Sequence, residues 1–199
     1  PIPRSLTMSA YADLDTSIID ELPPGRQAVQ TIALSNNRKD EIIEKIQQVC
    51  LDGQQIYWVC TLIEESEVLR AESAENTFSY LSDSLSGLQV MMIHGRLTKG
   101  DKEAIMQDFA AGKIDVLVAT TVIEVGIDFP NANVIVIENS NKFGLSQLHQ
   151  LRGRVGRGIR QGTCILLYKK NLSKNAKKRI HVLKSSNDGF LIAEEDMKL

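Results

Sequence analysis

The stretch Asp115-Val116-Leu117-Val118-Ala119-Thr120 decides the fold, because its four central residues are all apolar. A strand with one solvated face alternates apolar and polar side chains, whereas a strand covered on both faces is apolar at nearly every position. Similar short runs, rich in Val, Ile and aromatic residues, recur along the chain. We expect six strands: Val29–Leu34, Gln55–Thr61, Leu88–His94, Asp115–Thr120, Val134–Glu138 and Thr163–Tyr168.

The segments between these runs carry the periodicity of helices. Asp40–Cys50 places its apolar side chains on one face, and Thr98 with Asp101 forms a start of the capping-box type. Further helices are expected over residues 64–81, 173–184 and 189–198. Strands alternating with helices predict an α/β fold: a parallel sheet with helices on both faces, followed by a C-terminal helical hairpin.

The composition excludes several classes of protein. The 199 residues are 43% hydrophobic and 24% charged, which is typical of a globular domain and not of a disordered, collagen-like or coiled-coil chain. The apolar runs are far shorter than the ~20 residues of a membrane helix, so no membrane partner is expected. Three cysteines without metal-type spacing predict a reduced, cytoplasmic setting and no bound metal. No charged-then-apolar leader opens the chain, so we expect no secretory signal. Because the chain begins at Pro1 and not at Met, and ends at Leu199 in mid-pattern, we expect a piece of a longer protein.

Basic residues are unevenly distributed along the chain. Residues 1–138 hold 10 Lys and Arg against 21 Asp and Glu, whereas residues 139–187 hold 12 Lys and Arg and no acidic residue. Such a stretch indicates a surface that meets phosphate, from a nucleotide or from nucleic acid. A solvated basic face is the alternative that charge alone leaves open.

The segment Gln147-Leu148-His149-Gln150-Leu151-Arg152-Gly153-Arg154-Val155-Gly156-Arg157 is the strongest functional signal. If it is helical throughout, one stripe on one face holds Gln147, Gln150, Arg154 and Arg157. Guanidinium groups are permanently charged and bind phosphate oxygens in pairs, so the stripe suits a triphosphate. A structural network with carboxylates is the alternative. Because no Gly-rich loop ending in Gly-Lys-Ser/Thr occurs, we expect the chain not to hydrolyse ATP alone.

Four segments in order resemble motifs of superfamily 2 helicases. Gln150–Arg157 resembles motif VI, Ala119–Asp128 motif V, His94–Leu97 motif IVa, and Pro1–Arg4 the end of motif III. The whole chain is similar to the second motor domain of the RecG family of bacterial ATP-dependent DNA helicases.

Two alternatives to this resemblance stay open. The transcription-repair coupling factor shares the motif VI block, although Leu14–Gly25 and Tyr57–Cys60 look more like the RecG family. A non-enzymatic RecA-like module that binds nucleic acid is the alternative from another class.

The resemblance implies a RecA-like domain over residues 27–170. Residues 1–26 would connect it to a missing first motor domain, and residues 171–199 would begin a helical-hairpin translocation motif. The implied activity is translocation on double-stranded DNA that remodels branched DNA, namely stalled replication forks and Holliday junctions, in the bacterial cytoplasm at the nucleoid. ATP with Mg²⁺ would be bound mainly by the first motor domain, and a DNA-wedge domain of the same chain would be a further partner.

The resemblance also assigns roles at the nucleotide. Arg154 and Arg157 would be arginine fingers that reach the γ-phosphate of ATP, with Gln150 beside them; such fingers stabilise charge on the transferring phosphoryl group. Gly126 and Asp128 would approach the ribose, where glycine permits close approach of the backbone. A turn or helix-cap role before Pro130 is the alternative for Asp128.

A second set of residues is assigned to DNA. Thr120 and Thr121, after the fourth expected strand, would bond backbone phosphates without reading the sequence. Gly95 and Arg96 would do the same after the third strand. Arg179 matches an arginine of the translocation motif and would lie near DNA. The alternative is that the basic residues around Arg179 form a solvated helix face.

Overall fold

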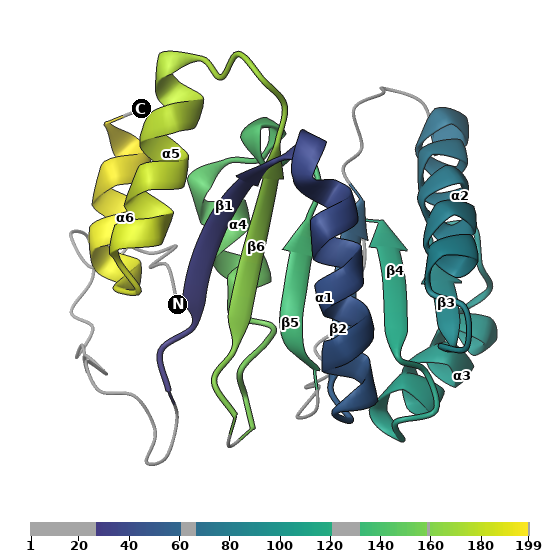
Figure 1. Cartoon of the computed structure of the whole chain (residues 1–199). Coiled ribbons are helices and arrows are strands. Elements are labelled where there is room, and N and C mark those ends of the chain that lie inside the picture. Colours follow the sequence, from purple (N-terminus) through teal and green to yellow (C-terminus); the bar gives the residue numbers. More distant parts are fainter. Residues whose placement is uncertain (1–26, 61–66, 121–131, 159, 199) are drawn as a thin grey trace, which may run out of the picture.

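A computed structural model describes residues 27–60, 67–120, 132–158 and 160–198. Within these ranges six strands form one sheet in the order β1-β6-β5-β2-β4-β3, and all neighbouring strands run parallel. The predicted parallel sheet is therefore confirmed (Figure 1). The strands are β1 (Gln30–Ser35), β2 (Gln55–Cys60), β3 (Val90–Ile93), β4 (Val116–Thr120), β5 (Ala132–Ile137) and β6 (Thr163–Tyr168).

Helices cover both faces of the sheet, as predicted. Buried side chains of α1 and α2 form a core with one face, and those of α3, α4, α5 and α6 form a second core with the other. In Figure 1 the last two helices form the expected hairpin beside β1. The helices are α1 (Lys39–Leu51), α2 (Glu67–Ser84), α3 (Lys99–Ala110), α4 (Leu145–Arg152), α5 (Lys174–Ser185) and α6 (Gly189–Met197), with short 3-10 turns η1 (Asn36–Arg38) and η2 (Ser140–Lys142).

Strand β2 shows why the central runs are apolar at every position. Ile56, Trp58 and Cys60 belong to the core under α1 and α2, whereas Tyr57 and Val59 belong to the opposite core. All five are buried. Because successive side chains of a strand point to opposite faces, a strand with helices on both sides is apolar along its centre. The buried polar residue at the start of β2, Gln55, has its amide satisfied by the carbonyls of Phe109 and Ile114.

Short polar residues begin three of the helices. The Thr98 hydroxyl accepts a hydrogen bond from the Asp101 N–H at 3.2 Å, which confirms the predicted start of α3. Ser173 does the same for α5 and Asp188 for α6. Each cap satisfies a backbone donor that the first helical turn leaves without a partner.

The parallel arrangement divides the sheet into two functional edges. In register, Cys60 lies opposite Thr120, Ile137 opposite Leu166 and Ser35 opposite Tyr168. The ends of all six strands therefore lie at one side, the carboxyl edge, and their beginnings lie at the other, the amino edge. These edges are about 17–20 Å apart for strands of five or six residues at ~3.3 Å per residue.

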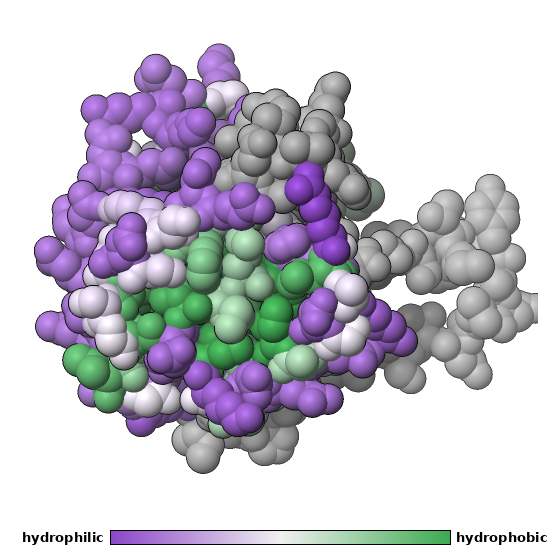
Figure 2. All heavy atoms as spheres, turned by 90° about the vertical axis from the view of Figure 1, so that its right-hand side faces the viewer, coloured by the Kyte–Doolittle hydropathy of each residue, from purple (hydrophilic) through white to green (hydrophobic). Residues whose placement is uncertain are grey.

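Strand β3 is an open border of the sheet. It pairs with β4 alone among the described strands, and its Met91 side chain is 42% exposed. Figure 2 views this side, and apolar side chains gather there between hydrophilic ones.

None of the helices in the described ranges is long and apolar enough to cross a bilayer.

Candidate functional site

Helix α4 carries the first part of the motif VI segment. It ends before Arg154 and Arg157, which the expected helical stripe included. Leu145 and Leu148 are fully buried against the sheet, and Gln150 is exposed. The helix ends at Arg152, so Arg154 and Arg157 follow it in a turn. The expectation of one helical stripe through Arg157 is therefore wrong, because only Gln150 of the three site residues lies on the helix.

Close approach between two backbone segments explains that turn. Gly156 has a φ of +69°, in the left-handed region that favours glycine. A Cβ there would lie 2.9 Å from the Cα of Gly162 and 3.2 Å from a methyl group of Val29. The Gly162 carbonyl in turn accepts a hydrogen bond from Gln30 N–H at 2.9 Å. The turn is thus fixed against the beginnings of β1 and β6, which places it at the amino edge.

The two arginines of this turn lie in different surroundings. Arg157 is exposed and its Nε donates to the Gly153 carbonyl at 3.1 Å. Arg154 is partly buried, and its positive charge acts on the Tyr57 phenol. Burial nevertheless dominates for Tyr57 and raises its pKa to about 12, so the phenol stays neutral. The turn therefore presents one guanidinium near the sheet and one toward solvent.

Arg152 is a structural residue that the sequence reasoning did not single out. Its side chain is buried, and Nη1 donates to the carbonyl oxygens of Leu183 at 2.7 Å and Ser186 at 2.8 Å, at the end of α5. Nη2 lies 3.0 Å from Nδ1 of His149. Burial lowers the pKa of Arg152, and burial together with the Arg152 charge lowers the pKa of His149 to about 4. A permanent charge in the acid-free segment thus holds α4 to α5.

The predicted DNA contacts lie at the carboxyl edge. Thr120 is the last residue of β4 and is buried. Gly95 and Arg96 are exposed in the turn after β3, where the Lys102 ammonium donates to the Gly95 carbonyl at 2.8 Å. A Cβ at Gly95 would meet no atom within 4 Å. The fold does not require glycine at this position, and the absence of a side chain leaves the backbone open to a ligand.

Arg179 differs from the other predicted DNA contacts. It lies on α5, is partly buried, and donates from Nη1 to the Phe143 carbonyl at 2.5 Å and from Nη2 to the Asn141 carbonyl at 3.4 Å. These bonds tie α5 to the loop between β5 and α4. Contact of Arg179 with DNA stays a prediction.

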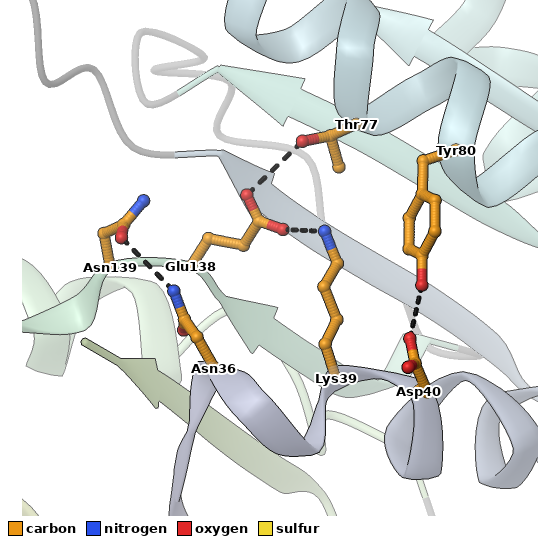
Figure 3. Close-up of polar contacts among 7 residues, drawn as sticks. All are labelled: Asn36, Lys39, Asp40, Thr77, Tyr80, Glu138 and Asn139. Atoms are coloured by element: carbon orange, nitrogen blue, oxygen red, sulfur yellow. Dashed lines mark hydrogen bonds and ion pairs between the residues drawn. The ribbon is translucent and has the colours of Figure 1, made fainter. Parts of the chain in front are cut away.

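A polar network that the sequence did not indicate joins α1, α2 and the end of β5 (Figure 3). Lys39 donates to Glu138 Oε1 at 2.6 Å, and the Thr77 hydroxyl donates to Glu138 Oε2 at 3.4 Å. The Lys39 ammonium also lies 5.3 Å from the ring centre of Trp58 and 4.9 Å from that of Tyr80. The ion pair is partly buried and so is screened less by salt than an exposed one.

The same network continues at its two ends. The Asn36 amide donates to the side chain of Asn139, and the Tyr80 hydroxyl donates to Asp40. Asn139 has a φ of +46°, so the chain reverses sharply as it leaves β5. These contacts hold the loops after β1 and β5 in fixed positions at the carboxyl edge.

The helicase conserved C-terminal domain family matches residues 33–158, which is more than half of the chain and includes both the turn with Arg154 and the end of β4. The chain belongs to this family. The prediction of a helicase motor domain, made from four motifs in order, is thus confirmed.

Relatives of this helicase C-terminal domain include "ATP-dependent DNA helicase RecG" of Escherichia coli K12, 55% identical over the whole chain and 29% of the relative. The protein of the same name from Thermotoga maritima is 47% identical, with 25% of its length covered. The chain thus spans less than a third of these relatives. A solved structure titled "Structure of RecG bound to three-way DNA junction" is 45% identical, with a TM-score of 0.83 over the whole chain and 26% of that protein.

More distant structures share the fold of this helicase C-terminal domain. Dbp5 of S. cerevisiae bound to RNA and ADP BeF3 has a TM-score of 0.64 at 17% identity, over 93% of this chain and 46% of that one. A likeness at this identity supports the RecA-like sheet and carries no functional assignment.

Three predicted site residues of the helicase C-terminal domain lie outside the described residues: Thr121, Gly126 and Asp128. The end of motif III at Pro1–Arg4 lies outside them as well. Their assigned roles stay predictions.

The three cysteines of the domain lie in its described part. Cys50, Cys60 and Cys164 are buried free thiols, and burial raises the pKa of each to about 12. Those ranges hold no group of three or more His, Cys, Asp or Glu residues that could bind a metal ion.

Proposed function

We propose that this chain is the second motor domain of an ATP-dependent translocase that remodels branched DNA, including stalled forks and Holliday junctions. One observation carries the proposal. Arg154 and Arg157 lie at the amino edge of a rigid sheet, and Thr120, Gly95 and Arg96 lie at its carboxyl edge. A sheet buried on both faces moves as one body, so a displacement driven at the arginines reaches the DNA contacts.

The donor set at the amino edge suits a phosphate supplied by another domain. The guanidinium groups of Arg154 and Arg157, one partly buried and one exposed, can together neutralise the charge of a γ-phosphate. The turn at Gly156 fixes the position of the backbone that carries them. When bound, ATP with Mg²⁺ supplies the free energy of phosphoryl transfer. In this proposal a preceding motor domain, joined through residues 1–26, holds most of the nucleotide, and residues 27–170 contribute the arginines.

The DNA partner follows from the carboxyl edge and from the relatives. Short polar side chains and open backbone at strand ends bind phosphates of any sequence, as a translocating motor requires. The RecG structure that is 45% identical to this chain was solved bound to a three-way DNA junction. We place the action of this protein on branched duplex DNA at the bacterial nucleoid, with a wedge domain of the same protein and the hairpin of residues 171–199 as moving parts.

Arginine substitutions in the complete protein test the motor assignment. Arg154→Ala and Arg157→Ala are each expected to lower DNA-stimulated ATP hydrolysis by about 10³-fold or more, because arginine fingers contribute that much to phosphoryl transfer. Binding of a fluorescent ATP analogue and of forked DNA is measured in parallel. Both should stay within a few-fold of the unsubstituted protein.

Arg160→Ala is the matched control, because Arg160 is an exposed arginine of the same segment whose Nη1 donates to the Asp52 carbonyl at 3.2 Å. Its hydrolysis rate should be unchanged. Normal hydrolysis and fork regression in Arg154→Ala and Arg157→Ala would mean that both arginines are structural, and the domain would then be a binding module.

A further inference from the structure

Five exposed lysines gather where β5 and β6 end. Lys142 belongs to η2, Lys169 and Lys170 follow β6, and Lys174 and Lys177 lie on the first turns of α5. We call these five residues the lysine patch. Lys142, Lys169 and Lys170 belong to none of the four helicase motifs identified from the sequence, whereas Lys174 and Lys177 lie in the segment compared with the translocation motif.

Backbone and side-chain bonds hold the two loops of the lysine patch together. The Ser140 hydroxyl donates to the Leu167 carbonyl at 3.0 Å, and Lys169 N–H donates to the Asn141 side chain at 3.5 Å. Arg179 then ties α5 to the same loop through the carbonyl of Phe143. The lysines therefore project from a fixed platform and not from a chain end.

The charge of the lysine patch is not balanced by the carboxylates around it. Several lysines elsewhere in the described ranges pair with acids, as in Lys39–Glu138, Lys113–Asp108 and Lys178–Glu195, whereas none of the five patch lysines forms an ion pair there. Two of the three acids on α6 already have partners, since Glu195 pairs with Lys178 and Lys198 and Asp196 accepts from Ser146, whereas Glu194 is exposed. An uncompensated cationic surface attracts a polyanion.

The lysine patch lies on the same edge as the predicted DNA contacts but at the other end of the sheet. Three strand spacings separate β6 from β4 in the order of the sheet, or about 14 Å at ~4.8 Å each. That separation is close to the width of the major groove of B-DNA, ~12 Å. The two ends of the carboxyl edge can therefore meet the two strands of one duplex.

We propose that the lysine patch is a second contact site of this domain, for the phosphate backbone of duplex DNA. The inference rests on the proposed function only in taking DNA as the polyanion. The contact is electrostatic and reads no sequence, so its strength falls with salt as counterions are released by each lysine–phosphate contact.

Paired substitutions in the complete protein test the lysine patch. Lys142→Gln with Lys170→Gln removes two charges, and binding to an unbranched fluorescein-labelled duplex is followed by anisotropy over a KCl series. We expect about tenfold weaker binding near physiological salt and a salt slope shallower by about 1.8, because each phosphate contact contributes ~0.9 to the slope. Lys142→Arg with Lys170→Arg keeps both charges and should restore the slope.

Lys45→Gln with Lys184→Gln is the charge-matched control, since both lysines are exposed, form no ion pair in the described ranges and lie on α1 and at the end of α5 far from the lysine patch. An unchanged slope in the patch variant, or an equal loss in the control, would overturn the proposal. Failure of the proposed function is distinguishable. If Arg154→Ala hydrolyses ATP normally while the salt slope of the patch variant becomes shallower as expected, the DNA contact of the lysine patch is supported and the motor assignment is overturned.

Discussion

Two glycine–arginine pairs lie at opposite edges of the sheet, and the space around their glycines differs. Beside Gly156 in the turn after α4, a Cβ would come within 2.9 Å of Gly162, and the backbone is left-handed. Beside Gly95 in the turn after β3, a Cβ would meet nothing within 4 Å. The first glycine is required by the fold, whereas the second leaves room for a ligand. Motif glycines thus separate into two kinds once their neighbours are known.

Alanine at the two glycines should produce opposite effects. Gly156→Ala is expected to lower the free energy of unfolding by about 2–4 kcal/mol, because it combines a left-handed backbone penalty with overpacking against Gly162. Gly95→Ala should change it by less than ~0.5 kcal/mol and weaken binding to duplex DNA. Urea unfolding of the 199-residue chain and anisotropy with labelled DNA measure the two quantities. Equal stability losses at both positions would contradict the distinction.

Arginines of the motif VI segment extend the comparison from backbone to side chains. Arg152→Met should cost about 2 kcal/mol of unfolding free energy, because the carbonyls of Leu183 and Ser186 lose their buried donor. Arg157→Ala removes an exposed side chain and should leave stability within ~0.5 kcal/mol. Urea unfolding of both variants measures the difference. A stable Arg152→Met protein would show that α4 is held to α5 by apolar packing instead.

His149 should make the amino edge sensitive to acid. Its pKa in the folded chain is about 4, below the ordinary 6.5, owing first to burial and then to the Arg152 charge. The unfolded chain therefore binds the proton more readily, so the contribution to stability is complete above pH 6.5 and is lost between pH 6.5 and 4. After allowance for partial exposure, the loss is roughly 1 kcal/mol. Urea unfolding at several pH values should show a smaller decline for His149→Gln, and identical declines would refute the assignment.

Local patterns account for most of the predicted elements. Thr163–Tyr168 matches β6 at both ends, and Asp40–Cys50 differs from α1 by one residue at each end. Both predictions depend on the spacing of apolar residues, every second residue in a strand and about every 3.6 residues in a helix. That spacing can be read from residues that are close together in the sequence. The end of α4 at Arg152 was missed, because it depends on the approach of Gly156 to Gly162.

The candidate site could be predicted only in its residue types. The motif order indicated Arg154, Arg157 and Gly95. However, the carbonyl partners of Arg152 lie at the end of α5 and directly after it, and Glu138 binds residues of α1 and α2. Such contacts depend on the order of strands in the sheet and on which helix covers which face. A sequence pattern holds neither fact.

The position of β1 has a consequence for how the chain is made. Its partner β6 comes late in the sequence, with Gln30 opposite Thr163 across 133 residues. Ribosomes synthesise and release a chain from its N-terminus, at ~5–20 residues per second. The first strand is therefore made roughly 7 to 27 seconds before the strand that completes its hydrogen bonds. During that interval the strand that pairs with β1 in the described sheet has not yet been made, so the hydrogen bonds of β1 form only after the ribosome has reached β6.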